Sequence, residues 1–273
     1  MISAPDFEYV TQLLLTKAAI RLSATQEYLV RSRLEPIAKQ AGLADLSALV
    51  EQLRREPYGE LHTRVVEAMT TNETSFFRDV HPFETLRSVI IPELLQRKVD
   101  RTLRIWSAAC ATGQEPYSLA MLCAEMPKLS GWKVQILATD LSRVTLDRAQ
   151  QGVYSSLEIG RGLPARALAQ HFDRAGTSFQ VKPGLRAMID WKQLNLAGRW
   201  PPMAIFDVIF IRNVLIYFSP ETASSVLQNA RIQLQPYGTL FLGTTENMLG
   251  LNAGFESMTY GKTICYKPGT QRR

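Results

Sequence analysis

Three strand-like apolar runs in this chain of 273 residues each end in polar side chains that could bind a small molecule. The polar or small residues are Gly113 and Glu115 after Leu103–Trp106, Asp140 after Val134–Thr139, and Arg212 with Asn213 after Phe206–Ile211. In a sheet of parallel strands wrapped by helices, the carboxyl ends of the strands meet at one edge, and ligands bind there. The three groups therefore predict one pocket at that edge.

The turn after the first run narrows the chemistry of the ligand. A helix-like segment, Tyr117–Met126, follows it, so backbone N–H groups of a helix N-terminus would face the ligand. The turn holds one glycine, Gly113, where the dinucleotide fingerprint needs three, so a nucleoside without phosphates fits better than a pyrophosphate. Asp140, about 25 residues beyond Glu115, is suitably spaced to accept hydrogen bonds from a ribose diol. Taken alone, the turn also fits an ordinary strand-to-helix connection.

The elements that position these residues alternate between strands and helices from Arg104 onward, which predicts a mostly parallel sheet covered by helices. Pro236-Tyr237-Gly238 is expected to turn into a strand over 239–243. Between 172 and 190 the pattern changes. Two short strands, 177–181 and 185–189, flank Lys182-Pro183-Gly184, so a β-hairpin is expected to project from the sheet as a small insert.

The N-terminal part, residues 1–80, reads as a helical domain. Apolar residues recur at helical spacing over 7–69, Ser23 and Gln26 form a capping box, and Pro36 is expected to kink or end the second helix. On that helix Arg31, Arg33 and Lys39 could project to a common side and receive an acidic partner. Ordinary solvated charges are the alternative.

The segment Met69–Arg78 breaks the helical pattern with Thr, Asn and Ser residues and ends in Phe76-Phe77-Arg78. The two aromatic rings are expected to anchor the segment, so that Arg78 is held in place. The alternative is that the polar residues cap a helix and the aromatic rings only fill space in the core. A connecting helix over 81–98 is expected to lead into the second domain, residues 99–273.

Composition limits the function classes. The chain is 46% hydrophobic and 21% charged, as in a soluble protein with a sizeable core. Its net charge is +6, with 9 basic and 11 acidic residues in 1–80 and 22 basic against 14 acidic residues beyond. This excess is dispersed, which favours a solvated surface over a nucleic-acid site.

The sequence also lacks the features that would indicate a membrane protein, a secreted protein or a metal-binding protein. We find no apolar run long enough for a membrane span and no signal peptide, so a cytoplasmic protein without membrane insertion is expected. Three cysteines, Cys110, Cys123 and Cys265, suit reduced thiols, with Cys110 as a packing residue, and the histidines lack metal-ligand spacing. No metal site is expected.

Longer motifs give the chain a specific resemblance. It resembles the chemotaxis receptor methyltransferases, the CheR family, in order along nearly its whole length. The motifs that carry the resemblance are Thr71-x-x-Thr74-x-Phe76-Phe77-Arg78, the turn Trp106–Ser118, Ala138-Thr139-Asp140, the segment Phe206–Phe218 and Gly243-x-x-Glu246-Asn247.

The resemblance implies a fold and an activity. The fold is α/β: a class I methyltransferase, Rossmann-like sheet with a small β-hairpin subdomain, preceded by the all-α domain. The activity is S-adenosyl-L-methionine-dependent O-methylation of glutamate side chains on the cytoplasmic helical bundles of chemoreceptors, with S-adenosyl-L-homocysteine as product. Such an enzyme is cytoplasmic and recruited to membrane receptors.

The resemblance also assigns roles to residues. Arg78 and Tyr217 are the catalytic candidates beside the transferred methyl group, and Arg31, Arg33 and Lys39 would face the receptor. The implied cofactor-binding residues are Asn72, Thr74, Arg78, Glu115, Asp140, Asn195, Leu196, Ile211 and Arg212. Because a glutamate with a pKa of about 4.3 is already ionised at neutral pH, catalysis would consist of positioning by Arg78 and Tyr217 rather than of proton removal.

Some family members dock a receptor C-terminal pentapeptide on the β-subdomain. Here the loop 177–185 looks short and lacks the extra glycine of those members, so we expect no dependence on this tether. Two other functions compete. A nucleic-acid amino-methyltransferase would carry N/D-P-P-Y/F where this chain has Ile211-Arg212-Asn213-Val214, and a non-catalytic scaffold would have lost Arg78, Glu115, Asp140 and Tyr217.

Overall fold

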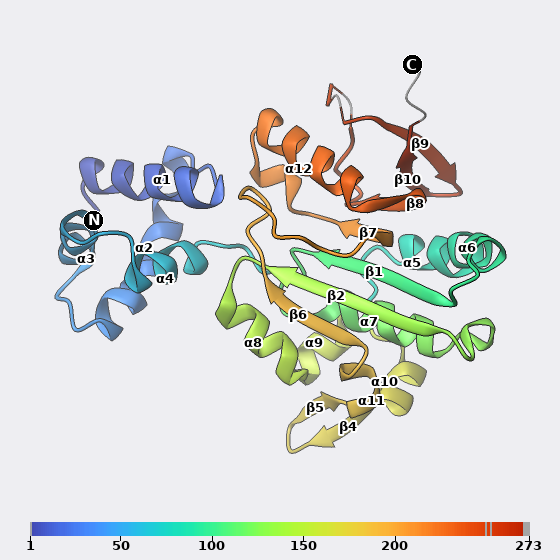
Figure 1. The fold of residues 1–273 in the computed structure, drawn as a ribbon. Helices are drawn as coiled ribbons and strands as arrows, with labels where there is room; N and C mark the ends of the chain where they lie inside the picture. The colour runs from blue at the N-terminus through green and yellow to red at the C-terminus, as the bar shows by residue number, and fades with distance from the viewer. Residues whose placement is uncertain (1, 249, 252, 270–273) are drawn as a thin grey trace. The chain divides into compact units, whose positions relative to one another are not determined.

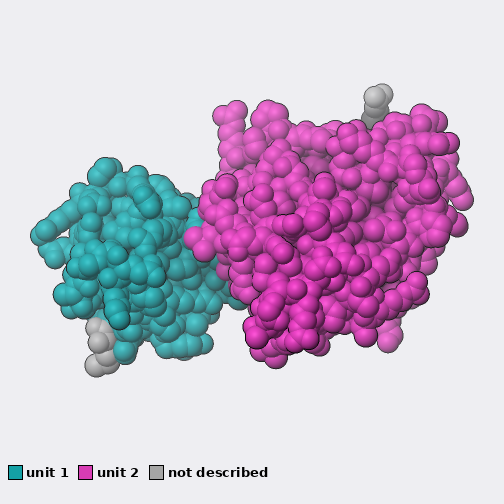
Figure 2. All heavy atoms as spheres, turned by 90° about the horizontal axis from the view of Figure 1, so that it is seen from below, with its two compact units in different colours: residues 1–71, 217–222 teal, residues 72–216, 223–273 magenta. Residues whose placement is uncertain are grey.

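The computed structural model describes residues 2–248, 250–251 and 253–269. The chain forms two compact units, coloured separately in Figure 2. The first runs to Thr71 and includes Tyr217–Thr222, and the second contains Asn72–Ile216 and the chain from Ala223 onward. The boundary at Thr71 lies earlier than the expected domain end at residue 80, because 72–80 packs with the second unit.

The first unit is helical, as expected from the apolar spacing. It contains α1 (Ala4–Ala18), the 3₁₀ turn η1 (Ala24–Gln26), α2 (Glu27–Gln40), α3 (Leu46–Arg55) and α4 (Glu60–Ala68) (Figure 1). Its core includes the fully buried side chains of Leu14, Leu34, Leu49 and Leu53. The Gln26 side chain accepts a hydrogen bond from the Ser23 backbone N–H at 2.9 Å, as the capping-box motif predicts.

Helix α2 does not end at Pro36; of the two expected outcomes there, a kink or a helix end, the helix end is wrong. It continues to Gln40 with the proline inside it. A proline removes the hydrogen bond to the carbonyl four residues earlier, which belongs to Ser32. Ser32 and Pro36 are both exposed, so water can satisfy that carbonyl and the helix persists.

The second unit contains a seven-stranded sheet in the order β6-β2-β1-β7-β8-β10-β9 (Figure 1). The strands are β1 (Thr102–Ala108), β2 (Lys133–Asp140), β6 (Ile189–Gln193), β7 (Phe206–Ile211), β8 (Leu234–Leu242), β9 (Phe255–Tyr260) and β10 (Thr263–Pro268). The first five in spatial order are parallel, and β10 is antiparallel to both β8 and β9. The expected Rossmann-like sheet is confirmed, with an antiparallel hairpin added at one edge.

Helices cover this sheet and complete the core. Helix α7 (Gln114–Ala124) packs against β2, and α8 (Arg143–Gln151) against β2 and β6. The expected single helix over 81–98 is instead α5 (His81–Thr85), a π-helical turn η2 (Leu86–Ile90) and α6 (Ile91–Arg97), and it contributes Phe83, Leu86 and Ile90 to the core. The other helices outside the small subdomain are η3 (Pro127–Leu129), η4 (Leu215–Tyr217) and α12 (Pro220–Ile232).

The small subdomain differs from the expected hairpin. It is a three-stranded sheet in the order β3-β5-β4, which lies beside α10 and α11 below the main sheet in Figure 1. Its elements are β3 (Val153–Ser155), α9 (Ser156–Gly160), α10 (Ala165–His171), β4 (Phe172–Ala175), β5 (Ser178–Val181) and the adjoining helix α11 (Pro183–Arg186). The pairing of 177–181 with 185–189 was therefore wrong.

The physical reason lies in two residues. Gly176, with φ +62°, makes the turn that joins β4 to β5. Pro183 opens a helix, where its missing N–H costs nothing, so the expected second hairpin strand begins in a helix and a turn, and its last residue, Ile189, begins a strand of the main sheet.

The expected turn at Pro236-Tyr237-Gly238 also has another form. Strand β8 already begins at Leu234 and runs through these residues, and its register against β7 shifts between Phe206 and Val208. The proline and glycine thus mark a bulge within a strand. Within the part of the chain that the structure describes, no helix is long and apolar enough to cross a membrane.

Candidate active site

The turn between β1 and α7 has an unusual backbone. Ala109 and Ala111 have φ values of +53° and +47°, in the left-handed region that alanine rarely occupies. Two hydrogen bonds hold the turn against the end of β2: the Cys110 N–H donates to the Thr139 carbonyl, and the Ala111 N–H donates to Asp140 Oδ2, each at 2.9 Å. Strained backbone held in this way is typical of a functional site.

Gly113 ends the turn and can only be glycine. Its φ is +94°, and a Cβ built on it would lie 2.9 Å from Ala149 Cβ and 3.0 Å from the Tyr154 hydroxyl. The glycine therefore lets α8 and β3 approach the start of α7 closely.

Glu115, in the first turn of α7, is buried and paired. Its Oε1 accepts from the Ser107 hydroxyl at 2.8 Å, and its Oε2 accepts from Arg212 Nη1 at 2.9 Å. The side chain of Arg212 is 1% exposed, so the two charges neutralise each other in a nearly dry environment. The sequence predicted that both residues lie at this edge of the sheet, but not that they pair.

Asp140 ends β2 with its carboxylate oriented by the backbone. Oδ2 accepts from the Ala111 N–H at 2.9 Å and Oδ1 from the Ser142 N–H at 3.0 Å. A carboxylate oxygen has two lone pairs, so each oxygen can accept more than one hydrogen bond, including one from a ligand hydroxyl. The Asp140 carboxylate is thus held in one orientation at the carboxyl end of β2.

The segment that carries Arg78 is anchored by aromatic rings, as expected. Phe76 is fully buried, with its ring edge-to-face against Tyr154 and Phe172 at centroid distances of 5.0 and 5.7 Å. The Phe77 N–H donates to the Ser118 hydroxyl at 2.9 Å, and Arg78 Nη1 donates to the Glu73 carbonyl at 2.9 Å. Both bonds restrict where the Arg78 guanidinium can reach.

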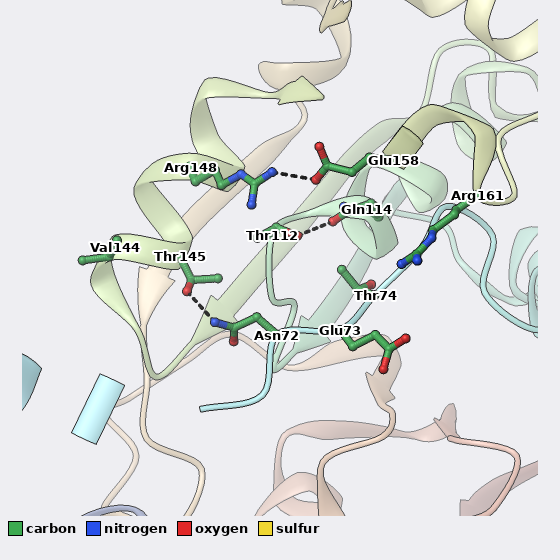
Figure 3. Close-up of a pocket in the computed structure, with 10 residues that line it drawn as sticks. All are labelled: Asn72, Glu73, Thr74, Thr112, Gln114, Val144, Thr145, Arg148, Glu158 and Arg161. Atoms are coloured by element: carbon green, nitrogen blue, oxygen red, sulfur yellow. Dashed lines mark hydrogen bonds and ion pairs between the residues drawn. The ribbon is translucent and has the colours of Figure 1, made fainter. Parts of the chain in front are cut away.

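A pocket of about 350 Å³ opens beside this segment (Figure 3). Its lining residues are Asn72, Glu73, Thr74, Thr112, Gln114, Val144, Thr145, Arg148, Glu158 and Arg161. Asn72 Nδ2 donates to Thr145 Oγ1 at 3.0 Å, and Arg148 pairs with Glu158 at 2.6 Å. Of the predicted residues, Asn72 and Thr74 line this pocket, whereas Arg78, Glu115 and Asp140 do not.

Sequence reasoning missed the α8 and α9 residues of this pocket. A usable signal was present, because Thr145 and Arg148 are three residues apart on the helix that follows Asp140 and so share one of its faces.

The loop after β6 lies close to Asp140. The Leu194 N–H donates to the Asp140 carbonyl at 2.9 Å, which brings Asn195 and Leu196 to the carboxyl end of β2. The Asn195 side chain accepts from the Ala197 N–H at 3.0 Å, and Leu196 is buried. Ile211 is fully buried within β7.

Glu246 organises the loop after β7, a role that sequence reasoning did not assign. Its Oε2 accepts from the N–H groups of Gly243 and Asn213 at 2.7 Å each, and its Oε1 accepts from Leu215 at 2.7 Å. A Cβ on Gly243 would lie 2.6 Å from Glu246 Oε2. The Gly243-x-x-Glu246 motif thus holds the loop that follows Arg212.

Tyr217, 36% exposed, ends η4 and groups with the first unit, so its role beside Arg78 stays a prediction.

The three predicted receptor-facing residues are not equivalent. Arg31, which pairs with Glu35 at 3.2 Å, and Lys39 line a pocket of about 400 Å³ in the helical unit. Arg33 does not line it. Its Nη1 donates to the carbonyls of Met69 and Thr70, both at 2.9 Å, just beyond the end of α4. The expected common side therefore holds for Arg31 and Lys39 but not for Arg33, which stabilises the C-terminal end of α4.

Cys110 behaves as a packing residue. Burial raises the pKa of its thiol well above the ordinary value, and the nearby Asp140 and Glu115 raise it further, so it stays protonated. Among the described residues, we find no group of three or more His, Cys, Asp and Glu side chains that could hold a metal ion.

Comparisons with known proteins agree with this geometry. Residues 5–70 match the family "CheR methyltransferase, all-alpha domain", and residues 72–264 match "CheR methyltransferase, SAM binding domain". The chain is 40% identical to chemotaxis protein methyltransferase Cher2 of Pseudomonas putida and to chemotaxis protein methyltransferase 1 of Pseudomonas aeruginosa, over 96% of this chain and 97% of each relative. It is 39% identical to the chemotaxis protein methyltransferase of Vibrio parahaemolyticus, over 97% of this chain and 98% of that protein. The chain with the strained turn, the paired Glu115 and the oriented Asp140 therefore belongs to the CheR methyltransferase family, and its cofactor is S-adenosylmethionine.

Proposed function

We propose that this chemotaxis methyltransferase esterifies glutamate side chains on the cytoplasmic helical bundle of chemoreceptors. The observation that carries the proposal is Arg78, a cation on an anchored segment of the S-adenosylmethionine-binding unit. A guanidinium suits a carboxylate acceptor because it is permanently charged and its N–H donors can bind and orient a carboxylate oxygen.

The residues at the sheet edge fit the cofactor. Asp140 offers oriented carboxylate oxygens to the ribose diol. Arg212 Nε is buried without a hydrogen-bond partner among the described residues, a pattern typical of a site that a ligand or water completes. We assign Asn72, Thr74 and Glu115 to the amino-acid end of the cofactor, and Asn195, Leu196, Ile211 and Arg212 to the walls around it.

The sulfonium of the bound cofactor supplies an activated methyl group. The acceptor glutamate, with an ordinary pKa of about 4.3, is already a nucleophile at neutral pH, so the protein needs no general base. One Nη1 donor of Arg78 is used by the Glu73 carbonyl, and the remaining donors of the fork are available to one carboxylate oxygen. In this proposal Tyr217 hydrogen-bonds one carboxylate oxygen, which leaves the second oxygen aligned for in-line attack.

Receptor recognition would use the helical unit. Arg31 and Lys39 are exposed and line one pocket, which suits a negatively charged helix. We propose that the enzyme works in the cytoplasm, is recruited to membrane receptors, and does not need a C-terminal pentapeptide tether.

Incubation with radiolabelled S-adenosylmethionine, receptor-containing membranes, and added RNA and DNA tests the proposal. We expect label on the receptor that mild base releases as methanol, the property of a carboxyl methyl ester. Base-stable label on the receptor, label on nucleic acid, or no label at all would each reject it. Receptors with the acceptor glutamates replaced by alanine are the matched control.

A further inference from the structure

The segment Phe77–Val80 around Arg78 has a strained backbone. Phe77, Asp79 and Val80 have φ values of +47°, +67° and +51°. Residues with a Cβ rarely adopt this region, and β-branched residues such as valine least of all. Such a conformation persists only where the surroundings hold it, and it often marks a functional constraint. The direction of Arg78 thus depends on whatever holds its two neighbours.

The Ser118 hydroxyl holds the Phe77 N–H. Arg212 holds Asp79 together with the Arg78 carbonyl. Its Nη2 donates to Asp79 Oδ2 at 2.6 Å and to the Arg78 carbonyl at 3.0 Å. The side chain of Arg212 is 1% exposed and that of Asp79 is 27% exposed, so this ion pair is only partly screened by water. Asp79 is a residue that neither the sequence nor the family comparison singled out.

The same guanidinium also reaches the cofactor side of the site. Its Nη1 donates to Glu115 Oε2 at 2.9 Å, and Glu115 is held in turn by Ser107. A guanidinium is planar and rigid, so a shift of Glu115 toward or away from it changes the position of the donors that hold Asp79. One buried cation therefore links the start of α7 with the segment that carries Arg78.

We propose that Asp79 is a positioning residue for methyl transfer, and that Arg212 transmits occupation of the cofactor site to the Arg78 segment through Asp79. This inference rests on the proposed function, in which Arg78 orients the acceptor carboxylate. Asp79 touches neither cofactor nor acceptor in this scheme. It acts by fixing the backbone on which Arg78 sits.

Asp79→Asn tests the proposal with almost no change in shape. We expect kcat for receptor methylation to fall about ten- to a hundredfold, the size of effect that a small misplacement of a positioning group produces. The affinity for S-adenosylhomocysteine, measured by calorimetry, should stay within about twofold, since Asp79 lies outside the cofactor contacts. A kcat within about twofold of the wild type, or a loss of affinity as large as the loss of kcat, would overturn the proposal.

The Lys98–Asp207 pair provides the matched control. It is another buried ion pair of the same unit, 2.9 Å long with side chains 4% and 0% exposed, and Asp207 lies at the start of β7, away from the carboxyl ends of the parallel strands. Asp207→Asn should lower the melting temperature yet leave kcat unchanged at a temperature where the variant is folded. An equal fall of kcat in both variants would mean that Asp79 acts only through stability, against the proposal.

Amide hydrogen exchange provides a readout that does not depend on the acceptor. In the wild type, S-adenosylhomocysteine should slow exchange over 77–80, and in Asp79→Asn this slowing should be lost although the ligand still binds. Equal slowing in both proteins would contradict the coupling. If the wild type methylates no receptor glutamate but shows the exchange effect, the proposed function fails while the link from cofactor site to segment stands.

Discussion

Two sets of cationic side chains in this chain work under opposite physical conditions. Arg212 is almost fully buried and uses two of its nitrogens on three fixed partners, whereas Arg31 and Lys39 lie exposed on the helical unit, Arg31 with a single neighbouring glutamate. A buried charge is weakly screened and fixes geometry, because leaving it unpaired is costly. An exposed charge is screened by salt and mainly affects how fast partners meet. In our proposal, the buried arginine of the S-adenosylmethionine-binding unit positions groups, and the exposed cations of the helical unit attract the receptor.

Arg78→Ala should show the largest effect, and it tests the positioning half of this comparison. Removing the guanidinium removes the fork that orients the acceptor, so we expect receptor methylation to fall on the order of a hundredfold or more. Calorimetry should show a much smaller loss of affinity for S-adenosylhomocysteine. Equal losses of rate and affinity would mean that Arg78 serves the cofactor and does not orient the acceptor.

Gly113→Ala should damage the fold of the same region. The new Cβ would meet Ala149 and Tyr154 in a backbone with positive φ, so we expect a loss of about 2 to 5 kcal/mol in the free energy of unfolding and weaker cofactor binding. Gly131→Ala is the control, because Gly131 has φ +76° but a Cβ added to it would meet nothing within 4 Å. Its cost should be about 1 kcal/mol, from backbone strain alone. Similar melting temperatures for the two variants would show that the close packing at Gly113 contributes little.

Charge reversal on the helical unit tests whether its exposed cations attract the receptor. Arg31→Glu combined with Lys39→Glu should raise KM for the receptor about three- to tenfold at low ionic strength with kcat unchanged, and added salt should shrink the difference. Arg33→Ala should instead lower the melting temperature, since Arg33 holds the carbonyls that follow α4. A larger effect of Arg33 on KM than of the other two would reverse their assignment.

Features that depend on a short local pattern of residues were predicted correctly from the sequence. Strand β7 was predicted with its observed bounds, and Phe76 was expected to anchor the Arg78 segment. Both follow from a short apolar run or an aromatic pair that any packing would bury.

The pattern failed where tertiary contacts decide. Pro36 was predicted to kink or end a helix, yet it is exposed and the helix continues past it. Pro183 was predicted to lie in a turn, yet it is the first residue of a helix. Arg33 differs from Arg31 and Lys39 because it binds a backbone carbonyl far along the chain, and Arg212 pairs with Asp79 and Glu115, which are also distant in sequence. The spacing of residues does not encode such partners.

A receptor pentapeptide should have the smallest effect. The loop expected over 177–185 is instead strand β5 and the start of α11. The connection between β4 and β5 consists of Gly176 and Thr177, so it offers few side chains for a docked peptide. If the enzyme needs no tether, its affinity for the receptor comes from the acceptor helix and the exposed cations that attract it. We therefore expect calorimetry to detect no tight pentapeptide binding, and KM to stay within about twofold for receptors with and without that C-terminus. Tight binding, or a KM that rises strongly when the pentapeptide is deleted, would mean that the small three-stranded sheet binds the receptor in place of the helical unit. The charge reversals at Arg31 and Lys39 should then have little effect on KM.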